Sequence, residues 1–276
     1  MSRKRVTQML PFLLPVRLMQ RKMFYYAKMR FDGRSYAETI DEKQLPYTLF
    51  ETDCALYNGN TGFDIVYQEN KVFNLKLAAK TLNGLLVKPG ETFSFWRCVR
   101  HADRHIPYKN GLKMLNGKLT TAPGGGLCQM SNLLFWMFLH MPLAVTERVG
   151  HDVKEFPEQN SGVIKGVDAT ISEGWIDVKA RNDTDCTYQI SVTFDDENII
   201  GTVFMDKRPQ VLYRIENGGA AYSRKSDGIY ESVNVERVEV DAVSGEATGP
   251  KLLYTNICKI CYPLAENVTI EEAKKP

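Results

Sequence analysis

Apolar residues between positions 70 and 84 recur at roughly every 3.6 residues, the period of a helix with one buried face. The positions that carry this period are Phe73, Leu77, Ala78 and Leu82. Gly84 follows them, and a glycine directly after a periodic segment is a typical helix stop. The pattern therefore predicts a helix packed on the core over residues 70–84.

The segments that follow have the spacing of strands and turns. Residues 85–96 predict a strand, a Pro-Gly turn at 89–90 and a second strand. On that second strand Phe93 and Phe95 are expected to point to one face, because side chains alternate along a strand. The Asn-Gly dipeptide at 116–117 predicts a β-hairpin turn.

The most apolar stretch of the chain covers residues 128–141. Helical spacing relates Met130, Leu133, Leu134, Met137 and Met141. Much of the opposite face is also apolar, through Phe135, Trp136, Phe138 and Leu139. A helix that is apolar on nearly all sides is buried, so we expect a central helix here, ended by Pro142.

Alternating patterns dominate the rest of the chain. Residues 167–194 predict two or three short strands separated by turns, and the sequence from about residue 209 onward is again β-patterned. These elements predict an α+β fold in which the buried central helix packs on an antiparallel sheet. We expect a basic N-terminal extension at 1–40, an α+β core domain at 41–208 and a β-rich C-terminal region at 209–276.

Composition adds a charge asymmetry to this picture. The chain of 276 residues has a net charge of +2, yet residues 1–34 carry nine Lys or Arg and one Asp. This segment predicts a basic helix that is either docked with a solvated basic face or placed on an anionic membrane surface. A secretory signal is not expected because Pro11 and Pro15 interrupt a short apolar run. We expect no nucleic-acid partner and a cytoplasmic location, with a peripheral membrane location as the alternative.

The six cysteines are few for this length and are not spaced as a disulfide framework, so most are expected to be reduced. An alternative is a zinc site assembled from Cys98, His101, His105, Cys258 and Cys261. Its spacing is not a standard one, and nucleotide-binding, zincin and serine-hydrolase motifs are absent from the sequence. We therefore expect no metal and no cofactor.

The sequence before the central helix suggests nucleophilic chemistry. The glycines Gly124, Gly125 and Gly126 lead, through one leucine, to Cys128 in the first turn of that helix. A thiol there lies near unpaired backbone N–H groups at the positive end of the helix dipole, which favours the thiolate. Glycine N–H groups and the Gln129 side chain are candidate donors to an oxyanion.

A nucleophilic cysteine needs a base, and four histidines are available. His140 lies more than three turns along the helix from Cys128, which is too far. His151 follows the helix by about ten residues and is expected where the sheet begins, and Asp168 is expected to open the next strand. This chain order of thiol, histidine and aspartate is that of transglutaminase-like and papain-like enzymes. The structural alternative is a small buried cysteine, a structural histidine and an aspartate at a strand entry.

Four segments together resemble the VanW family: NGLLVKPGETFSF, GGGLCQMSNLLF, ERVGH and VDATISEGWIDVKARNDT. The resemblance is best over residues 70–194. The family pattern lies on Pro89, Gly90, Phe93, Ser94, Phe95, Gly124, Gly125, Gly126, Cys128, Gln129, Ser131, His151, Asp168, Ala169 and Thr170. Trp96 and Asn132 depart from it, since the family usually has asparagine and serine or threonine there.

The resemblance implies an accessory role in glycopeptide resistance, in a system that replaces the terminal D-alanine of cell-wall precursors with D-lactate. It supplies no mechanism, so three hypotheses stay open. In the first, Cys128 is the nucleophile, His151 the base and Asp168 its orienting partner, in acyl transfer or hydrolysis on a cell-wall peptide. Substrate would be held by Gly124, Gly125, Gly126, Gln129 and Ser131. The second is a module that binds a precursor carboxylate, and the third is a scaffold recruited to the membrane.

Overall fold

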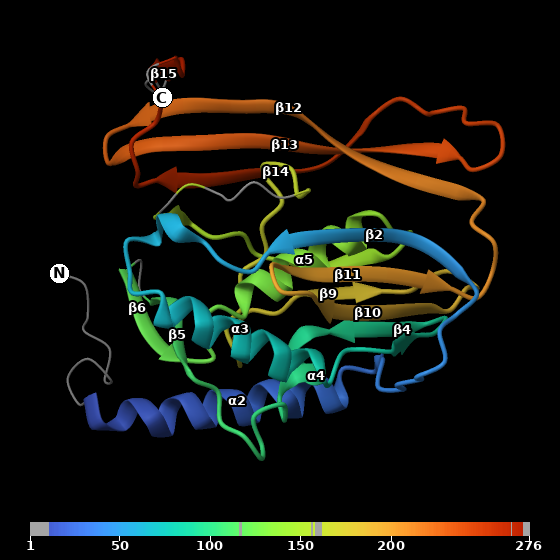
Figure 1. Ribbon diagram of the computed structural model, residues 1–276, viewed down its shortest axis with the longest axis horizontal. Coiled ribbons are helices and arrows are strands. Elements are labelled where there is room, and N and C mark those ends of the chain that lie inside the picture. The colour runs from blue at the N-terminus through green and yellow to red at the C-terminus, as the bar shows by residue number, and fades with distance from the viewer. Residues whose placement is uncertain (1–10, 116–117, 156, 158–161, 266, 273–276) are drawn as a thin grey trace.

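The structure is a computed structural model that describes residues 11–272 except 116–117, 156, 158–161 and 266 (Figure 1). It confirms the α+β class. Its helices are η1 (Pro11–Leu13), α2 (Leu14–Phe31), η2 (Gly59–Thr61), α3 (Val66–Ala79), α4 (Phe95–Val99) and α5 (Cys128–Leu139). Each sheet below packs on α5 or extends from the elements that do.

The central sheet has the order β2-β11-β10-β3 and is antiparallel throughout. Its strands are β2 (Tyr47–Ala55), β11 (Asn198–Met205), β10 (Tyr188–Phe194) and β3 (Leu85–Val87). Helix α5 packs against it, and the ring of Phe50 on β2 meets that of Trp136 edge to face, with 6.1 Å between centroids. Nine of the twelve residues of α5 are buried. The buried central helix predicted from the sequence is therefore confirmed.

A second, smaller sheet covers another side of α5. Its order is β1 (Ser35–Tyr36), β4 (Glu91–Ser94), β9 (Lys179–Arg181) and β7 (Ala144–Glu147). Phe93 of β4 contacts Phe138 of α5, with 4.9 Å between ring centroids, and both side chains are fully buried. One helix thus connects two sheets through a single aromatic core.

The C-terminal strands form a third sheet, which lies above the core in Figure 1. Its order is β15 (Ile270–Glu272), β12 (Val211–Lys225), β13 (Gly228–Asp241), β14 (Lys251–Ile260) and β8 (Val153–Lys154). The β-rich pattern predicted from residue 209 onward is confirmed. A separate hairpin joins β5 (Asn110–Leu115) to β6 (Lys118–Pro123). Its predicted Asn-Gly turn at 116–117 lies outside the described residues.

Two predicted elements have different bounds. The helix predicted at 70–84 is α3, which begins at Val66 and ends at Ala79, before the predicted stop at Gly84. In the turn that leads into it, the Asp64 carboxylate accepts a hydrogen bond from the Val66 N–H at 3.0 Å. The second strand predicted in residues 85–96 ends at Ser94, whose hydroxyl caps the short helix α4. Phe95 is therefore buried in a helix and does not share a strand face with Phe93.

Helix α2 packs on the core through one face of its C-terminal half. Met29 is buried, and the Tyr25 hydroxyl donates a hydrogen bond of 2.7 Å to the Asp177 carboxylate. The basic N-terminal helix that the sequence predicts is therefore present and docked. Among the described residues, no helix is both long enough and apolar enough to cross a membrane.

Candidate functional site

The glycine loop before α5 is held by close backbone contacts. A Cβ atom on Gly125 would collide with the backbone of Gly111 on β5, and the Asn74 amide of α3 donates a hydrogen bond of 3.0 Å to the Gly125 carbonyl. Gly126 has a φ of +90°, and a Cβ there would collide with the side chain of Lys71. These glycines allow the hairpin and α3 to approach the start of α5 and hold Cys128 in place.

Cys128 is the first residue of α5 and is half-buried. Its thiol interacts with the His151 side chain and with the Ile171 backbone N–H, and its Sγ lies 4.0 Å from the Thr170 hydroxyl. Burial opposes ionisation of the thiol, but the hydrogen bond from His151 and its charge outweigh burial and lower the pKa of Cys128. The environment therefore favours the thiolate.

His151 contacts Asp168 on its other side. The His151 Nδ1 atom lies 2.6 Å from Asp168 Oδ1, and the His151 backbone N–H donates to Oδ2 at 2.6 Å. Burial alone would lower the pKa of His151, but its hydrogen bonds to Asp168 and Cys128 raise that pKa well above its ordinary value. The same contacts outweigh burial at Asp168 and lower its pKa. The imidazolium form is thus stabilised between two anionic groups.

The structure brings the three predicted residues together, although not on the expected elements. His151 and Asp168 were expected at strand entries, and both lie in irregular segments. The segment around Asp168 is positioned instead by side chains of α5. Asn132 accepts the Ala169 N–H at 2.7 Å, and the Ser131 hydroxyl donates to the Ala169 carbonyl at 2.6 Å.

Two further residues support this centre, and sequence reasoning missed their role. Arg148 Nε donates to the Asp168 carbonyl at 2.6 Å, and its Nη2 donates to Asn256 Oδ1 at 2.5 Å. A Cβ on Gly150 would lie 2.7 Å from that same Asn256 oxygen. Arg148 and Gly150 lie beside His151 in the ERVGH segment, and the family resemblance of that segment was a sequence signal for both residues. Asn256 belongs to β14, more than a hundred residues away, and nothing near it in sequence indicates its place.

The predicted substrate-binding residues have mostly structural contacts. The Gly125 N–H donates to the Ala122 carbonyl at 3.0 Å, and the Gln129 amide donates to the Ala55 carbonyl at 2.7 Å. Ser131 is fully buried. In this conformation, these donors of Gly125 and Gln129 are therefore occupied, and Ser131 has no surface for a ligand. Gly124 and Gly126 are partly exposed at the loop.

The alternative zinc site is not assembled. Among the residues that the structure describes, no group of three or more His, Cys, Asp or Glu side chains is placed to hold a metal ion. Cys98 lies on α4, where burial raises the pKa of its thiol to about 12, whereas Cys258 lies on β14 in the C-terminal sheet. The two halves of the proposed ligand set are thus on separate parts of the fold (Figure 1).

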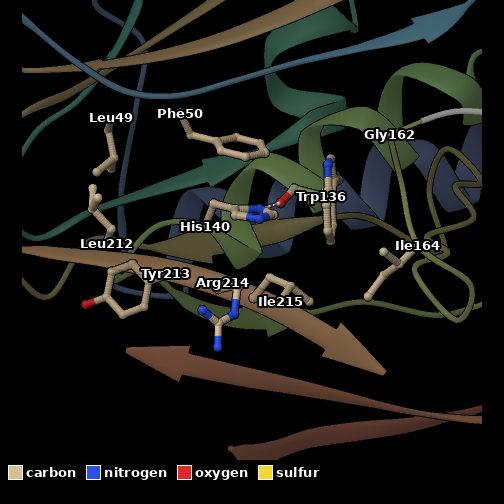
Figure 2. Close-up of a pocket in the computed structure, with 10 residues that line it drawn as sticks. All are labelled: Leu49, Phe50, Trp136, His140, Gly162, Ile164, Leu212, Tyr213, Arg214 and Ile215. Carbon is tan, nitrogen blue, oxygen red and sulfur yellow. Dashed lines mark hydrogen bonds between the residues drawn. The ribbon is translucent and has the colours of Figure 1, made fainter. Parts of the chain in front are cut away.

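A cavity of about 430 Å³ lies at the other end of α5, between β2 and β12 (Figure 2). In it the His140 ring stacks on Phe50, with 3.7 Å between centroids and 7° between planes. Burial lowers the pKa of His140 to about 4, so this histidine is neutral at physiological pH. The cavity lining contains no cysteine, aspartate or glutamate. The candidate for chemistry is therefore the Cys128 end of the helix.

These features define the class as an α+β protein with a thiol–imidazole–carboxylate chain at the start of its buried helix. Residues 70–204 match the family model described as VanW like protein. The chain is 71% identical over 275 residues to the vancomycin B-type resistance protein VanW of Enterococcus faecalis strain ATCC 700802 / V583, covering 100% of both chains. The chain therefore belongs to the VanW family.

A more distant relative shares part of this similarity. The uncharacterized protein YoaR of Bacillus subtilis strain 168 is 33% identical over 162 residues, which cover 57% of this chain and 52% of YoaR. No solved structure matches the chain. The resemblance in arrangement to transglutaminase-like and papain-like enzymes therefore stays a prediction.

Proposed function

We propose that this protein contributes to vancomycin resistance through cysteine-dependent acyl transfer or hydrolysis on a peptidoglycan-related peptide. The 71% identity to the vancomycin B-type resistance protein VanW of Enterococcus faecalis supports the cellular role. The arrangement of the Cys128 thiol beside His151, whose Nδ1 lies 2.6 Å from Asp168, carries the proposed chemistry. A buried structural cysteine requires no such partners, whereas a nucleophile requires a base and an orienting carboxylate.

In the proposed reaction, the Cys128 thiolate attacks a carbonyl carbon of the peptide and forms the carbon–sulfur bond. The tetrahedral oxyanion collapses as His151 gives its proton to the leaving amine or alkoxide. The resulting thioester is then attacked by water or by an acceptor amine, whose proton passes to His151. The carbon–sulfur bond breaks, the acyl group leaves on the acceptor, and the Cys128 thiolate beside the protonated His151 is restored. Asp168 holds the imidazole in position and stabilises its charged form.

The oxyanion requires donors that differ from those expected at first. The Gly125 N–H and the Gln129 amide are occupied, and the backbone N–H groups of Gln129, Met130 and Ser131 donate to the carbonyls of Gly126 and Leu127. We therefore assign this role to the Cys128 backbone N–H and to the Thr170 hydroxyl. Thr170 lies beside the thiol in the same segment as Asp168. A substrate carbonyl placed at Cys128 would thus meet donors from two separate parts of the chain.

The test is covalent labelling of the purified protein by a thiol-directed acylating probe. Cys128→Ala should fold as the wild type does and lose the labelling, because the reactive thiolate is gone. Cys186→Ala is the matched control, since burial and Asp185 raise the pKa of that half-exposed thiol. Equal labelling of Cys128→Ala and wild type would contradict the proposal.

One further variant distinguishes the catalytic site from the alternative, a module that only binds the precursor. We would incubate the protein with peptides that end in D-alanyl-D-alanine or D-alanyl-D-lactate and measure both binding and release of the terminal residue. His151→Ala should retain binding and lose turnover if the site is catalytic. Binding without turnover in the wild type, unaffected by His151→Ala, would assign the site to the binding module instead.

A further inference from the structure

Helix α2 presents an apolar stripe to solvent. Val16, Met23, Phe24 and Phe31 have exposed fractions of 57%, 61%, 60% and 85%. Spacings of seven, eight and fifteen residues from Val16 place all four on one helix face. Ala27 lies between them on the same face and is also exposed. A stripe of this length is more than the isolated exposed apolar residues that soluble surfaces normally carry.

The contacts of the opposite face fix this orientation. Tyr25 donates to Asp177, the Tyr26 hydroxyl donates to Glu173 at 3.0 Å, and Met29 is 4% exposed. These contacts use the face that points toward the core. The apolar stripe therefore points outward because the helix is held through its other face, and rotation of α2 to bury the stripe would break these hydrogen bonds.

The charges beside the stripe are all of one sign. Helix α2 contains no acidic residue. Arg21 stacks on Trp175 at 4.1 Å and Lys22 pairs with Glu173, so these two cations serve the contact with the core.

The three remaining cations of α2 flank the stripe. Helical spacing places Arg17 and Lys28 along one side of it and Arg30 along the other. Within the part of the chain that the structure describes, none of the three forms an ion pair with a carboxylate, and all are exposed. The outward face of α2 therefore combines apolar side chains with unneutralised positive charge.

We infer that this face of α2 docks on an anionic lipid bilayer surface. Apolar side chains of an interfacial helix enter the boundary between headgroups and acyl chains, while flanking cations meet the anionic headgroups. The docked core would hold α2 parallel to the membrane plane. This inference does not rest on the proposed function, because it uses no residue of the Cys128 centre.

The main rival occupant is a second copy of the chain. An isologous contact through the same stripe would bring Arg17, Lys28 and Arg30 of one copy toward the same cations of the other. Like charges placed opposite one another oppose association, whereas an anionic surface is complementary to all three. The charge pattern thus favours the bilayer over a dimer.

The experiment is flotation of the full chain with vesicles of mixed phosphatidylglycerol and phosphatidylcholine, and with vesicles of phosphatidylcholine alone. The wild-type protein should float with the anionic vesicles, and added salt should weaken this binding. The double variant Phe24→Glu/Phe31→Glu should lose this binding, because it replaces the two exposed rings with charges of the wrong sign. Val243→Glu is the matched control, since Val243 is 85% exposed in the C-terminal region, and it should bind as wild type does.

A second variant tests the charges separately. Replacing Arg17, Lys28 and Arg30 together by glutamine should lower affinity for anionic vesicles about 100-fold, since each cation near such a surface contributes about fivefold. Cys128→Ala should float normally, which keeps a failure of the proposed chemistry distinct from a failure here. The inference is overturned if wild type does not float with anionic vesicles, or if the double variant floats equally well. A wild-type dimer that the double variant dissociates, without vesicle binding, would assign the face to a second copy.

Discussion

A largely buried histidine lies at each end of helix α5, and the pKa values of the two rings are shifted in opposite directions. His151 lies at the Cys128 end, where Asp168 and the thiol raise its pKa. His140 lies at the far end, stacked on Phe50, where burial lowers its pKa to about 4. Burial disfavours the charged ring at both places, and only the anionic neighbours of His151 reverse that effect.

This difference separates a reactive arrangement from a packed one. A nucleophilic thiolate needs a cation beside it, and His151 is stabilised as that cation by Asp168. His140 keeps a neutral ring whose Nδ1 is 3.0 Å from the Trp136 carbonyl, and it contributes aromatic packing to the cavity wall. The adjacent carboxylate and thiol, more than the histidine itself, determine which of the two rings is charged.

The largest effect is expected when the Asp168 carboxylate is removed. Asp168→Ala should lower the free energy of unfolding at pH 7 by about 3–5 kcal/mol, because it leaves a buried partner without its counter-charge. The pKa of Asp168 is lowered in the fold, so its contribution is present above about pH 4 and is lost as pH falls through that lowered pKa. Urea unfolding at several pH values measures both effects.

The control for this variant is Asp227→Ala, which breaks an exposed ion pair with Lys259. That change should cost far less stability than the loss of Asp168, because water screens an exposed ion pair. If the Asp168 and Asp227 variants lost equal stability, the His151–Asp168 pair would contribute no more than a surface ion pair.

A smaller effect on stability is expected at the other end of α5, where protonation of the His140 ring is unfavourable. The lowered pKa of His140 means that the unfolded chain binds an extra proton between about pH 6.5 and 4. Wild type should therefore lose stability as pH falls across this window, with a contribution from His140 on the order of 3 kcal/mol. His140→Phe keeps the stacking on Phe50 and should flatten that part of the stability profile. An unchanged profile would show that His140 titrates normally.

The smallest effect concerns the reactivity of the thiol. His151→Ala should raise the pKa of Cys128, because burial opposes the thiolate and the hydrogen bond and charge of His151 no longer offset it. The variant should slow alkylation by iodoacetamide at pH 7 about tenfold. The pH profile of the rate in wild type should have its midpoint below the ordinary cysteine pKa of about 8.5. His140→Ala serves as the control and should leave the rate unchanged. Equal alkylation rates in wild type and His151→Ala would contradict an ion pair between the Cys128 thiolate and His151.

Local patterns predicted much of this architecture. The apolar run of α5 and the alternating C-terminal strands are confirmed, because each depends on a period within one segment. The patterns were weaker at boundaries. Ser94 ends β4 by capping α4, since a single side-chain hydrogen bond outweighs periodicity at the end of an element. Helix α3 begins and ends earlier than its apolar period suggests.

The candidate centre was predictable as a set of residue types and not as a geometry. Cys128, His151 and Asp168 were named from their chemistry and chain order. The strand entry expected for Asp168 was wrong, because side chains of α5 position the irregular segment that contains it. His151 lies two residues before β8. Arg148 was recognisable only as part of a family segment, and its partner Asn256 comes from β14.

The amino-acid sequence by itself determined which residues are buried in α5, where the chain can bend before Cys128, and how strongly basic the first helix is. These follow from side-chain hydrophobicity, glycine geometry and charge, which are local properties. Only the tertiary structure decided which histidine is charged, which donors are already occupied, and which face of α2 meets solvent. Those outcomes depend on contacts between segments far apart in the chain, since the energy of a charge or hydrogen bond is determined by its neighbours in space.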